Sequence, residues 1–144
     1  MLENKRKAYV YRFVDLNDRT LYVGKCVNLD KRMKKHWSKS SHLKKQGMGN
    51  LYDKVQRIEY LECKTEYEAL HKELDYITYY KPKYNTMSKI KEVIEPPDDL
   101  YKWKIYKVLK PISEQELKIR NKNEKLLPIF MLFLFIMIII NFII

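Results

Sequence analysis

The sequence predicts an α+β fold in which a small three-stranded antiparallel sheet is flanked by helices. Three observations predict it. Strand-forming segments alternate with turn residues, two other segments carry apolar residues at helical spacing behind a capping residue, and 144 residues provide for one ordinary domain with its own core. The chain has no room for a second domain of ordinary size.

The N-terminal segment predicts a β-hairpin. Residues 8–14 are rich in aromatic and β-branched side chains, residues 15–20 are turn formers, and residues 21–24 return to strand character. A third strand is predicted at residues 55–61, with a short turn before it around residues 51–54. These three segments make up the predicted sheet.

The first predicted helix follows the hairpin. Asn28 is a favourable N-cap, and the helix runs to about Trp37. Leu29, Met33 and Trp37 recur one turn apart and form its buried stripe, whereas Arg32 shares another face with the histidine one turn later, His36. The polar, glycine-containing residues 38–50 predict a loop after it.

The second predicted helix begins after Thr65, which forms a capping box with Glu68. It ends at Lys81, because Pro82 cannot continue a helix. Its apolar residues at helical spacing are Tyr67, Leu70, Leu74 and Ile77.

The composition predicts three regions. Residues 1–90 form the folded domain. The composition changes after it, and residues 95–99 (EPPDD) are interpreted as a boundary. Residues 91–125 are a charged linker or appendage of undecided fold, with one strand-like patch at residues 103–109. The remaining residues, 126–144, are apolar.

The apolar tail comprises 19 residues without a charge. At about 1.5 Å per residue a helix of this length crosses most of a hydrocarbon layer of roughly 30 Å, so we expect a C-terminal helix that anchors the chain in a membrane. Its basic flank predicts that the domain stays cytoplasmic. The flanking residues are Lys118, Arg120, Lys122 and Lys125. A partner-binding or dimerising segment, and a frame-shifted gene end, are the alternatives.

The charge favours nucleic acid as partner. The formal net charge is +11; residues 1–90 hold 20 Lys/Arg against 11 Asp/Glu, and residues 91–144 hold 9 against 7. Ribosomal and membrane-surface proteins also carry an excess of positive charge, so charge alone does not identify the chemistry. We expect the basic helix and loop to contact DNA phosphates, which gives no sequence specificity, with Trp37 packing rather than stacking on a base. The expected contacts are Lys31, Lys34, Lys35, Lys39, Lys44 and Lys45.

Two cysteines, Cys26 and Cys63, have neither metal-ligand spacing nor the density of a disulfide framework. They predict free thiols in a reducing compartment. The first residues are basic but lack an apolar segment behind them, so no signal peptide is predicted.

Residue types suited to phosphodiester cleavage lie at element ends around the predicted sheet. Hydrolysis needs a group that activates water, cations that hold developing negative charge, and usually a divalent metal on a carboxylate. Taken singly, each is ordinary, because strand tyrosines usually belong to the core and helix charges usually face solvent. Only their joint spacing indicates a site. The set is Tyr11, Tyr22, Lys25, Arg32, His36, Glu73 and Asn85.

The order of these motifs resembles the GIY-YIG nuclease family. Y-V-Y is followed after ten residues by Y-V-G, then by R-x-x-x-H, a helical Glu and, twelve residues later, the Asn of P-x-Y-N. The resemblance covers Tyr9 to about Thr86, with Tyr9 in the place of the first glycine. Residues 21–36 are most similar to the cleavage domain of the bacterial excision-repair nuclease, and we expect a stand-alone nuclease of bacterial or phage type without that enzyme's other domains.

The resemblance implies roles for the hairpin and the first helix. Tyr22 would be the general base or would position the attacking water, with Tyr11 shaping the site beside it. Lys25 would lower the pKa of Tyr22 through its positive charge. Arg32 would bind the scissile phosphate and stabilise the pentavalent transition state, which a bidentate guanidinium fits better than an ammonium.

The resemblance also implies roles for the other positions. His36 would assist proton transfer or hydrogen-bond the phosphate, and Asn85 would order the segment after the second helix. Glu73 would be the single carboxylate ligand of Mg²⁺ or Mn²⁺, the cation being held otherwise by water and phosphate oxygens. His42 and His71 fall outside the pattern and are interpreted as ordinary polar positions.

The resulting hypothesis is a metal-dependent endonuclease that hydrolyses DNA and needs no small-molecule cofactor. One alternative is a module of the same fold that only binds nucleic acid. The other is a membrane-tethered interaction protein.

Overall fold

A computed structural model describes residues 6–86, 95–114, 116–118 and 128. Two compact units divide the chain, residues 1–110 and residues 111–144. In the second unit the described part is a short helical turn, in which the Ser113 hydroxyl and backbone N–H both donate to the Glu116 carboxylate. The first unit contains all the strands among the described residues.

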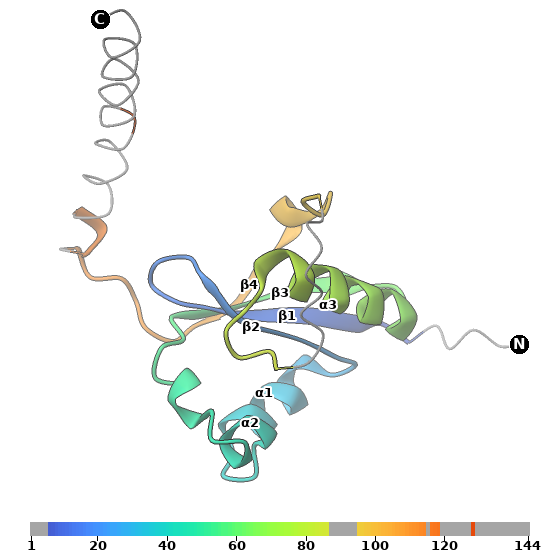
Figure 1. Ribbon diagram of the computed structural model, residues 1–144, viewed down its shortest axis with the longest axis horizontal. Coiled ribbons are helices and arrows are strands. Elements are labelled where there is room, and N and C mark those ends of the chain that lie inside the picture. Colours follow the sequence, from blue (N-terminus) through green and yellow to red (C-terminus); the bar gives the residue numbers. More distant parts are fainter. Residues whose placement is uncertain (1–5, 87–94, 115, 119–127, 129–144) are drawn as a thin grey trace, which may run out of the picture. The chain divides into compact units, whose positions relative to one another are not determined.

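The first unit is built on a four-stranded antiparallel sheet (Figure 1). Its strands are β1 (Ala8–Val14), β2 (Thr20–Cys26), β3 (Arg57–Cys63) and β4 (Lys104–Val108), in the order β2-β1-β3-β4. The three predicted strands and the α+β class are confirmed, but the predicted number of three strands is wrong. The strand-like patch in the predicted linker pairs with β3, where it satisfies backbone groups that an edge would leave open.

Helices cover both faces of the sheet (Figure 1). On one face lie α1 (Leu29–Trp37) and the short α2 (His42–Lys45), and on the other lies α3 (Glu66–Tyr80). Both predicted caps form, because the Asn28 side chain accepts from the N–H of the third residue of α1 and the Thr65 side chain does the same for α3. The helices therefore begin where the capping residues predict.

The loop predicted at residues 38–50 is wrong in part. It contains α2 and runs into a 3-10 turn, Gly49–Leu51. Leu43 and Leu51 are 2% and 0% exposed, so two buried leucines fix this segment against the sheet although its remaining residues are polar.

Each face of the sheet has its own apolar cluster. Tyr11, Phe13 and Tyr22 point toward α1, whereas Val10 and Val23 point toward α3, as the two-residue alternation of strands requires. The α1 cluster also contains Leu29 and Met33 and confirms the first two positions of the predicted stripe. Trp37 is 37% exposed, yet its ring lies 5.4 Å from that of Phe13, so it packs as predicted.

The stripe predicted for α3 is wrong at its N-terminal end. Tyr67 is 72% exposed and Leu70 is 39% exposed. The residues that α3 buries are instead Ala69, Tyr76 and Ile77, with Thr78 beside them. A small Ala faces the sheet in the first turns of the helix, and large side chains fill the space only in the last turns.

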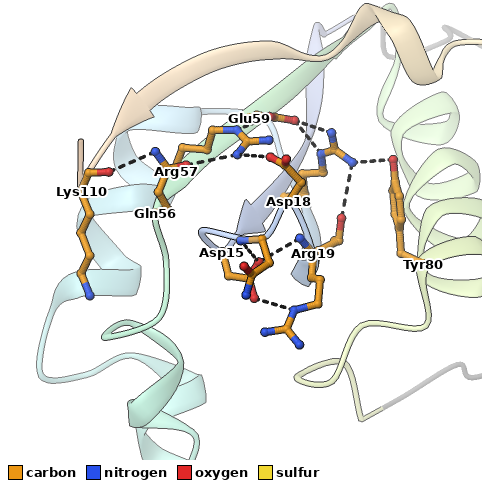
Figure 2. A network of polar contacts seen from close by, with 11 residues as sticks. Asp15, Asp18, Arg19, Gln56, Arg57, Glu59, Tyr80 and Lys110 are labelled. Atoms are coloured by element: carbon orange, nitrogen blue, oxygen red, sulfur yellow. Dashed lines mark hydrogen bonds and ion pairs between the residues drawn. The ribbon is translucent and has the colours of Figure 1, made fainter. Parts of the chain in front are cut away.

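A polar network ties the hairpin to β3 on the α3 face (Figure 2). Arg12 binds the Glu59 carboxylate, which also accepts from Arg57 Nε at 2.6 Å, and Arg57 reaches Asp18 at 2.7 Å. The Arg12 guanidinium also donates to the Tyr80 hydroxyl at the end of α3. These carboxylates are neutralised by arginines, so they hold the fold together and offer no open metal site.

The predicted apolar helix at residues 126–144 lies outside the described residues, except for residue 128. Across the parts of the chain that the structure describes, no helix has the length and hydropathy needed to span a membrane. The predicted division into regions stays a prediction. Both cysteines are free thiols, as expected.

Candidate active site

The predicted site residues meet at the free edge of the sheet. Strand β2 is an edge strand, so α1 on one face and α3 on the other can both reach past it. Tyr22 of β2 is within electrostatic reach of Arg32 from α1 and of Glu73 from α3. A hydroxyl, a cation and a carboxylate from three separate elements therefore converge on one edge.

Arg32 is held by the two tyrosines of the hairpin. Its Nε donates to the Tyr11 hydroxyl at 2.8 Å, and its guanidinium also hydrogen-bonds Tyr22. Burial lowers the pKa of the Arg32 guanidinium, but the interactions with the Tyr11 and Tyr22 oxygens outweigh this effect, so the pKa of Arg32 is raised overall. Arg32 is thus a permanent, oriented cation.

The environment of Tyr22 differs from the expected one. Burial raises the pKa of its hydroxyl, Arg32 opposes that rise, and Glu73 adds to it. Among the groups that act most strongly on Tyr22, the cation is Arg32, and the expected effect of Lys25 on the pKa of Tyr22 stays a prediction. The Lys25 charge and backbone N–H act on Glu73.

Glu73 is a half-buried carboxylate that fits a hard cation. Burial raises its pKa, while Lys25 and Arg32 favour its charged form. Nowhere in the described ranges do three or more His, Cys, Asp or Glu side chains gather into a possible metal site. Burial raises the pKa of the neighbouring Cys26 thiol to about 11, so in the absence of a metal ion this thiol is protonated at neutral pH.

His36 is buried behind Tyr11. Its Nε2 lies 2.7 Å from the Tyr11 hydroxyl, and its Nδ1 lies 3.1 Å from the Tyr52 hydroxyl, which in turn lies 2.7 Å from Ser41 Oγ. The Tyr11 oxygen also accepts from Arg32 Nε, so this one hydroxyl joins Arg32 to His36. Both ring nitrogens are occupied, so His36 positions Tyr11, and the expected contact with phosphate or substrate proton is not what the geometry provides.

We expect His36 to make the protein lose stability in acid. Burial, with help from Arg32 and His42, lowers the pKa of His36 to about 3, so the unfolded chain binds a proton that the folded chain refuses between about pH 6.5 and pH 3. The stabilisation is complete above pH 6.5 and is lost as the pH falls through this window. Between pH 7 and pH 4 the loss is on the order of 3 kcal/mol.

Urea unfolding of the wild type, His36→Phe and His71→Gln at several pH values checks this expectation. His36→Phe should flatten the dependence of the unfolding free energy on pH, whereas the exposed His71 should not. An unchanged slope in His36→Phe would show that His36 is protonated in the folded state.

Gly24 is required by the packing of the two tyrosines. A Cβ at this position would lie 2.5 Å from the Tyr11 hydroxyl and 2.9 Å from Tyr22 Cε1. Tyr11 is fully buried and hydrogen-bonded on both sides, so it cannot move aside. The final glycine of Y-V-G therefore provides the space in which the hydroxyl groups meet.

Gly24→Ala is expected to destabilise the fold by about 2 kcal/mol through overpacking. Gly49→Ala is the control, because there the nearest atom outside the adjacent residues, on the Lys44 side chain, would be 3.7 Å from the new Cβ. Thermal unfolding of both variants measures the difference. Equal melting temperatures would mean that Tyr11 and Tyr22 yield easily, contrary to the arrangement described.

Asn85 fastens the segment after α3 to strand β2. Its Oδ1 accepts from the Val23 N–H at 2.9 Å, and its Nδ2 donates to the Val23 carbonyl at 2.8 Å. The adjacent Tyr84 N–H donates to the Leu21 carbonyl at 3.1 Å. The amide thus binds both backbone groups of Val23, and the Tyr84 N–H binds the carbonyl on the other side of Tyr22, so residues 84 and 85 tie the segment after α3 to β2.

Three residues near the site were not predicted. Tyr52 and Ser41 extend the hydrogen bonds of His36, and the His42 ring lies 5.5 Å from that of His36 and 6.5 Å from that of Tyr22. Ser41 and His42 belong to the segment that was expected to be a loop, and Tyr52 to the short turn expected around residues 51–54. His71 stays outside the site, and its ring meets the Tyr67 ring edge to face with centroids 4.3 Å apart.

The lysines expected to contact DNA lie on α1, α2 and the turn between them. All except Lys44 are exposed. Lys44 Nζ donates to the Trp37 carbonyl and lies 5.2 Å over the Tyr52 ring, so it braces the segment. The exposed members are Lys31, Lys34, Lys35, Lys39 and Lys45.

Comparison with known proteins confirms the resemblance that the motifs indicated. Residues 7–86 match the family model of the UvrC-like GIY-YIG domain. UvrABC system protein C of Hydrogenobaculum sp. is 36% identical over 69 residues, which are 48% of this chain and 12% of that protein. The same protein of Aquifex aeolicus is 37% identical over 83 residues, 58% of this chain and 14% of its own length.

The chain thus spans about an eighth of the length of these relatives. Among solved structures, the N-terminal GIY-YIG endonuclease domain of UvrC from Thermotoga maritima, bound to its catalytic divalent cation, magnesium, has a TM-score of 0.48 at 23% identity. The similarity covers 57% of this chain and 86% of that one.

Proposed function

This chain belongs to the family of UvrC-like GIY-YIG domains, and we propose that it is a metal-dependent endonuclease that hydrolyses phosphodiester bonds in DNA. The observation that carries the proposal is the convergence of Tyr22, Arg32 and Glu73 at the edge of β2. Together they supply the water-directing group, the cation and the metal-binding carboxylate that this hydrolysis needs. The two free thiols suggest the cytoplasm as the place of action.

Arg32 binds the scissile phosphate in this proposal. Tyr11 holds Nε, and this orients the terminal nitrogen atoms toward phosphate oxygens at the β2 edge. A guanidinium whose position is fixed in advance stabilises the charge that develops on the phosphorane without reorganising. His36 supports this orientation, because its Nε2 lies 2.7 Å from the Tyr11 hydroxyl and holds it in place.

Tyr22 directs the attacking water. Its hydroxyl is buried with a raised pKa, so it is neutral at pH 7 and hydrogen-bonds the water as an acceptor. In this neutral form Tyr22 orients the water and does not take its proton, and the neighbouring Arg32 stabilises the negative charge that develops on the phosphate oxygens. Lys25 keeps Glu73 in its charged form beside the reaction.

Glu73 is the proposed ligand of Mg²⁺ or Mn²⁺. A bound divalent cation would supply Lewis-acid stabilisation of the phosphate oxygens and of the leaving oxygen. A cation next to the half-buried Glu73 carboxylate offsets the free-energy cost of burying its negative charge. The exposed lysines of α1 and α2 contact phosphates further along the DNA and position the substrate.

Fluorescently labelled duplex, nicked and branched DNA, incubated with the full-length chain, tests the proposed function. Cleavage in Mg²⁺ or Mn²⁺, and none with a chelator, is the expected result. Salt-sensitive binding to every DNA form, without cleavage in either metal, would instead establish a nucleic-acid-binding module on the same fold.

A further inference from the structure

We propose that a pocket beside the active site, walled by Tyr9, Tyr60 and Tyr106, binds one nucleobase of the DNA. The proposal rests on the proposed function in one respect, that DNA is the substrate. It adds a subsite that recognises a base, whereas the lysines of α1 and α2 recognise only backbone.

The pocket has aromatic walls set at steep angles. The Tyr9 and Tyr60 rings lie 6.0 Å apart at 63°, and the Tyr60 and Tyr106 rings lie 6.5 Å apart at 89°. The cavity measures about 280 Å³, just under the range of about 300–1,000 Å³ that is usual for drug-sized ligands. A single heterocycle is a guest of suitable size, and stacking of a base on an aromatic side chain tolerates any base.

The polar groups of the pocket suit a base and repel a phosphate. Asp30 and Glu62 line it together with Asn28, and of the described lining residues none is a lysine or arginine. Carboxylates accept from the amino groups of cytosine, adenine and guanine. Tyr106 donates its hydroxyl proton to Asp30, which keeps this ring in place. The interior is thus an acceptor-rich aromatic cavity in a chain whose net charge is positive.

Lysines stand where the phosphates flanking such a base would pass. Glu62 pairs with Lys104 at 3.2 Å and with Lys7 at 3.8 Å, and both lysines are well exposed. Their ammonium groups lie beside the pocket and do not line it. A nucleotide with its base in the pocket would therefore keep its phosphates next to cations.

The pocket adjoins the active site. Tyr9 lies opposite Cys26 in the pairing of β1 with β2. The Cys26 thiol is within electrostatic reach of Arg32 and Glu73, and also of Tyr106. The three wall residues pack against the cluster that contains Tyr11 and Tyr22. A base in the pocket thus belongs to a nucleotide close to the scissile phosphate.

Two of the three walls are additions to the family pattern. Tyr9 occupies the position of the first glycine of the G-I-Y motif. Tyr106 comes from β4, which lies beyond the matched residues 7–86. Strand β4 therefore does more than close the sheet edge, because it brings the ring that completes the pocket.

Binding without metal tests the pocket separately from cleavage. Labelled single-stranded oligonucleotides are titrated with the full-length chain in chelator, and each is compared with versions that carry an abasic site at successive positions. At one position the abasic site should weaken binding by about tenfold, and Tyr106→Ala should weaken binding of the intact strand by a similar factor. Tyr106→Ala and the abasic strand together should lose no more than either alone.

Two variants control for damage to β4. Tyr106→Phe keeps the ring and should retain the preference for intact over abasic strands, whereas Tyr101→Ala removes a ring that is 81% exposed and lies outside the pocket, and should bind as the wild type does. Equal binding of intact and abasic strands by the wild type would overturn the base pocket. Competition for the pocket by arginine amide, with no effect of nucleosides, would also overturn it by identifying a cationic guest.

The readout also separates this proposal from the proposed function. A preference for intact strands in a protein that never cleaves supports the pocket and contradicts the nuclease. Cleavage by a protein without this preference supports the nuclease and contradicts the pocket.

Discussion

Arg32→Ala is expected to lower the single-turnover rate of DNA cleavage by about 10³-fold or more, the range seen when a guanidinium that stabilises phosphoryl transfer is removed. Both hairpin tyrosines hold Arg32, Tyr11 through Nε and Tyr22 through a second hydrogen bond. Its loss removes the charge at the scissile phosphate and also the donor that orients Tyr11. Among the described residues no lysine contacts the hydroxyl groups of Tyr11 and Tyr22, so none can replace the charge of Arg32 there.

Arg32→Lys separates charge from geometry. Lysine keeps one positive charge but cannot bind Tyr11 and two phosphate oxygens at once, so an intermediate loss is expected. Lys31→Ala, one residue away and exposed, is the control and should change DNA affinity without a comparable change in the rate of the bound complex. Full activity in folded Arg32→Ala would remove Arg32 from the reaction.

Glu73→Gln should reduce metal-dependent cleavage by at least about 100-fold, because an amide oxygen is a neutral and weaker ligand for a hard cation. The change keeps the shape of the side chain and its place on α3, so the fold should survive. Asp75→Asn is the matched control, since it neutralises an exposed carboxylate two residues along the same helix. Rates are measured over a range of Mg²⁺ and Mn²⁺ concentrations.

DNA affinity in chelator distinguishes a metal ligand from a general charge effect. Glu73→Gln should bind DNA as well as the wild type or better, because one negative charge is gone. If Asp75→Asn lost as much activity as Glu73→Gln, the effect would be one of helix charge and not of metal binding.

Local signals in the sequence were sufficient for much of the fold. The hairpin, α1 and α3 were predictable because turn residues and caps act within a few positions, and Asn28 and Thr65 cap as expected. The fourth strand was not predictable as part of the sheet. Its residues have strand character, but pairing Lys104–Val108 with β3 depends on a partner more than 40 residues away, a distance at which local propensity carries no information.

The site was predictable in its members more than in their contacts. The order of the motifs was enough to group Tyr22, Arg32 and Glu73, because each lies on an element that reaches the same edge of the sheet. The partners of each group depend on side-chain direction, so the contribution of Lys25 to the charged form of Glu73 was not predicted. Tyr52 was missed because two buried leucines, and no motif, fold its segment under His36.

Nicking of supercoiled plasmid by the full-length chain, with Mg²⁺, Mn²⁺ or chelator and beside Glu73→Gln, tests most directly whether the β2 edge is a metal-dependent hydrolytic site. The account predicts conversion to the open circular form in either metal, none in chelator, and a loss of at least about 100-fold in the variant. Plasmid that is bound but stays supercoiled in both metals, or nicking that Glu73→Gln leaves intact, would contradict it.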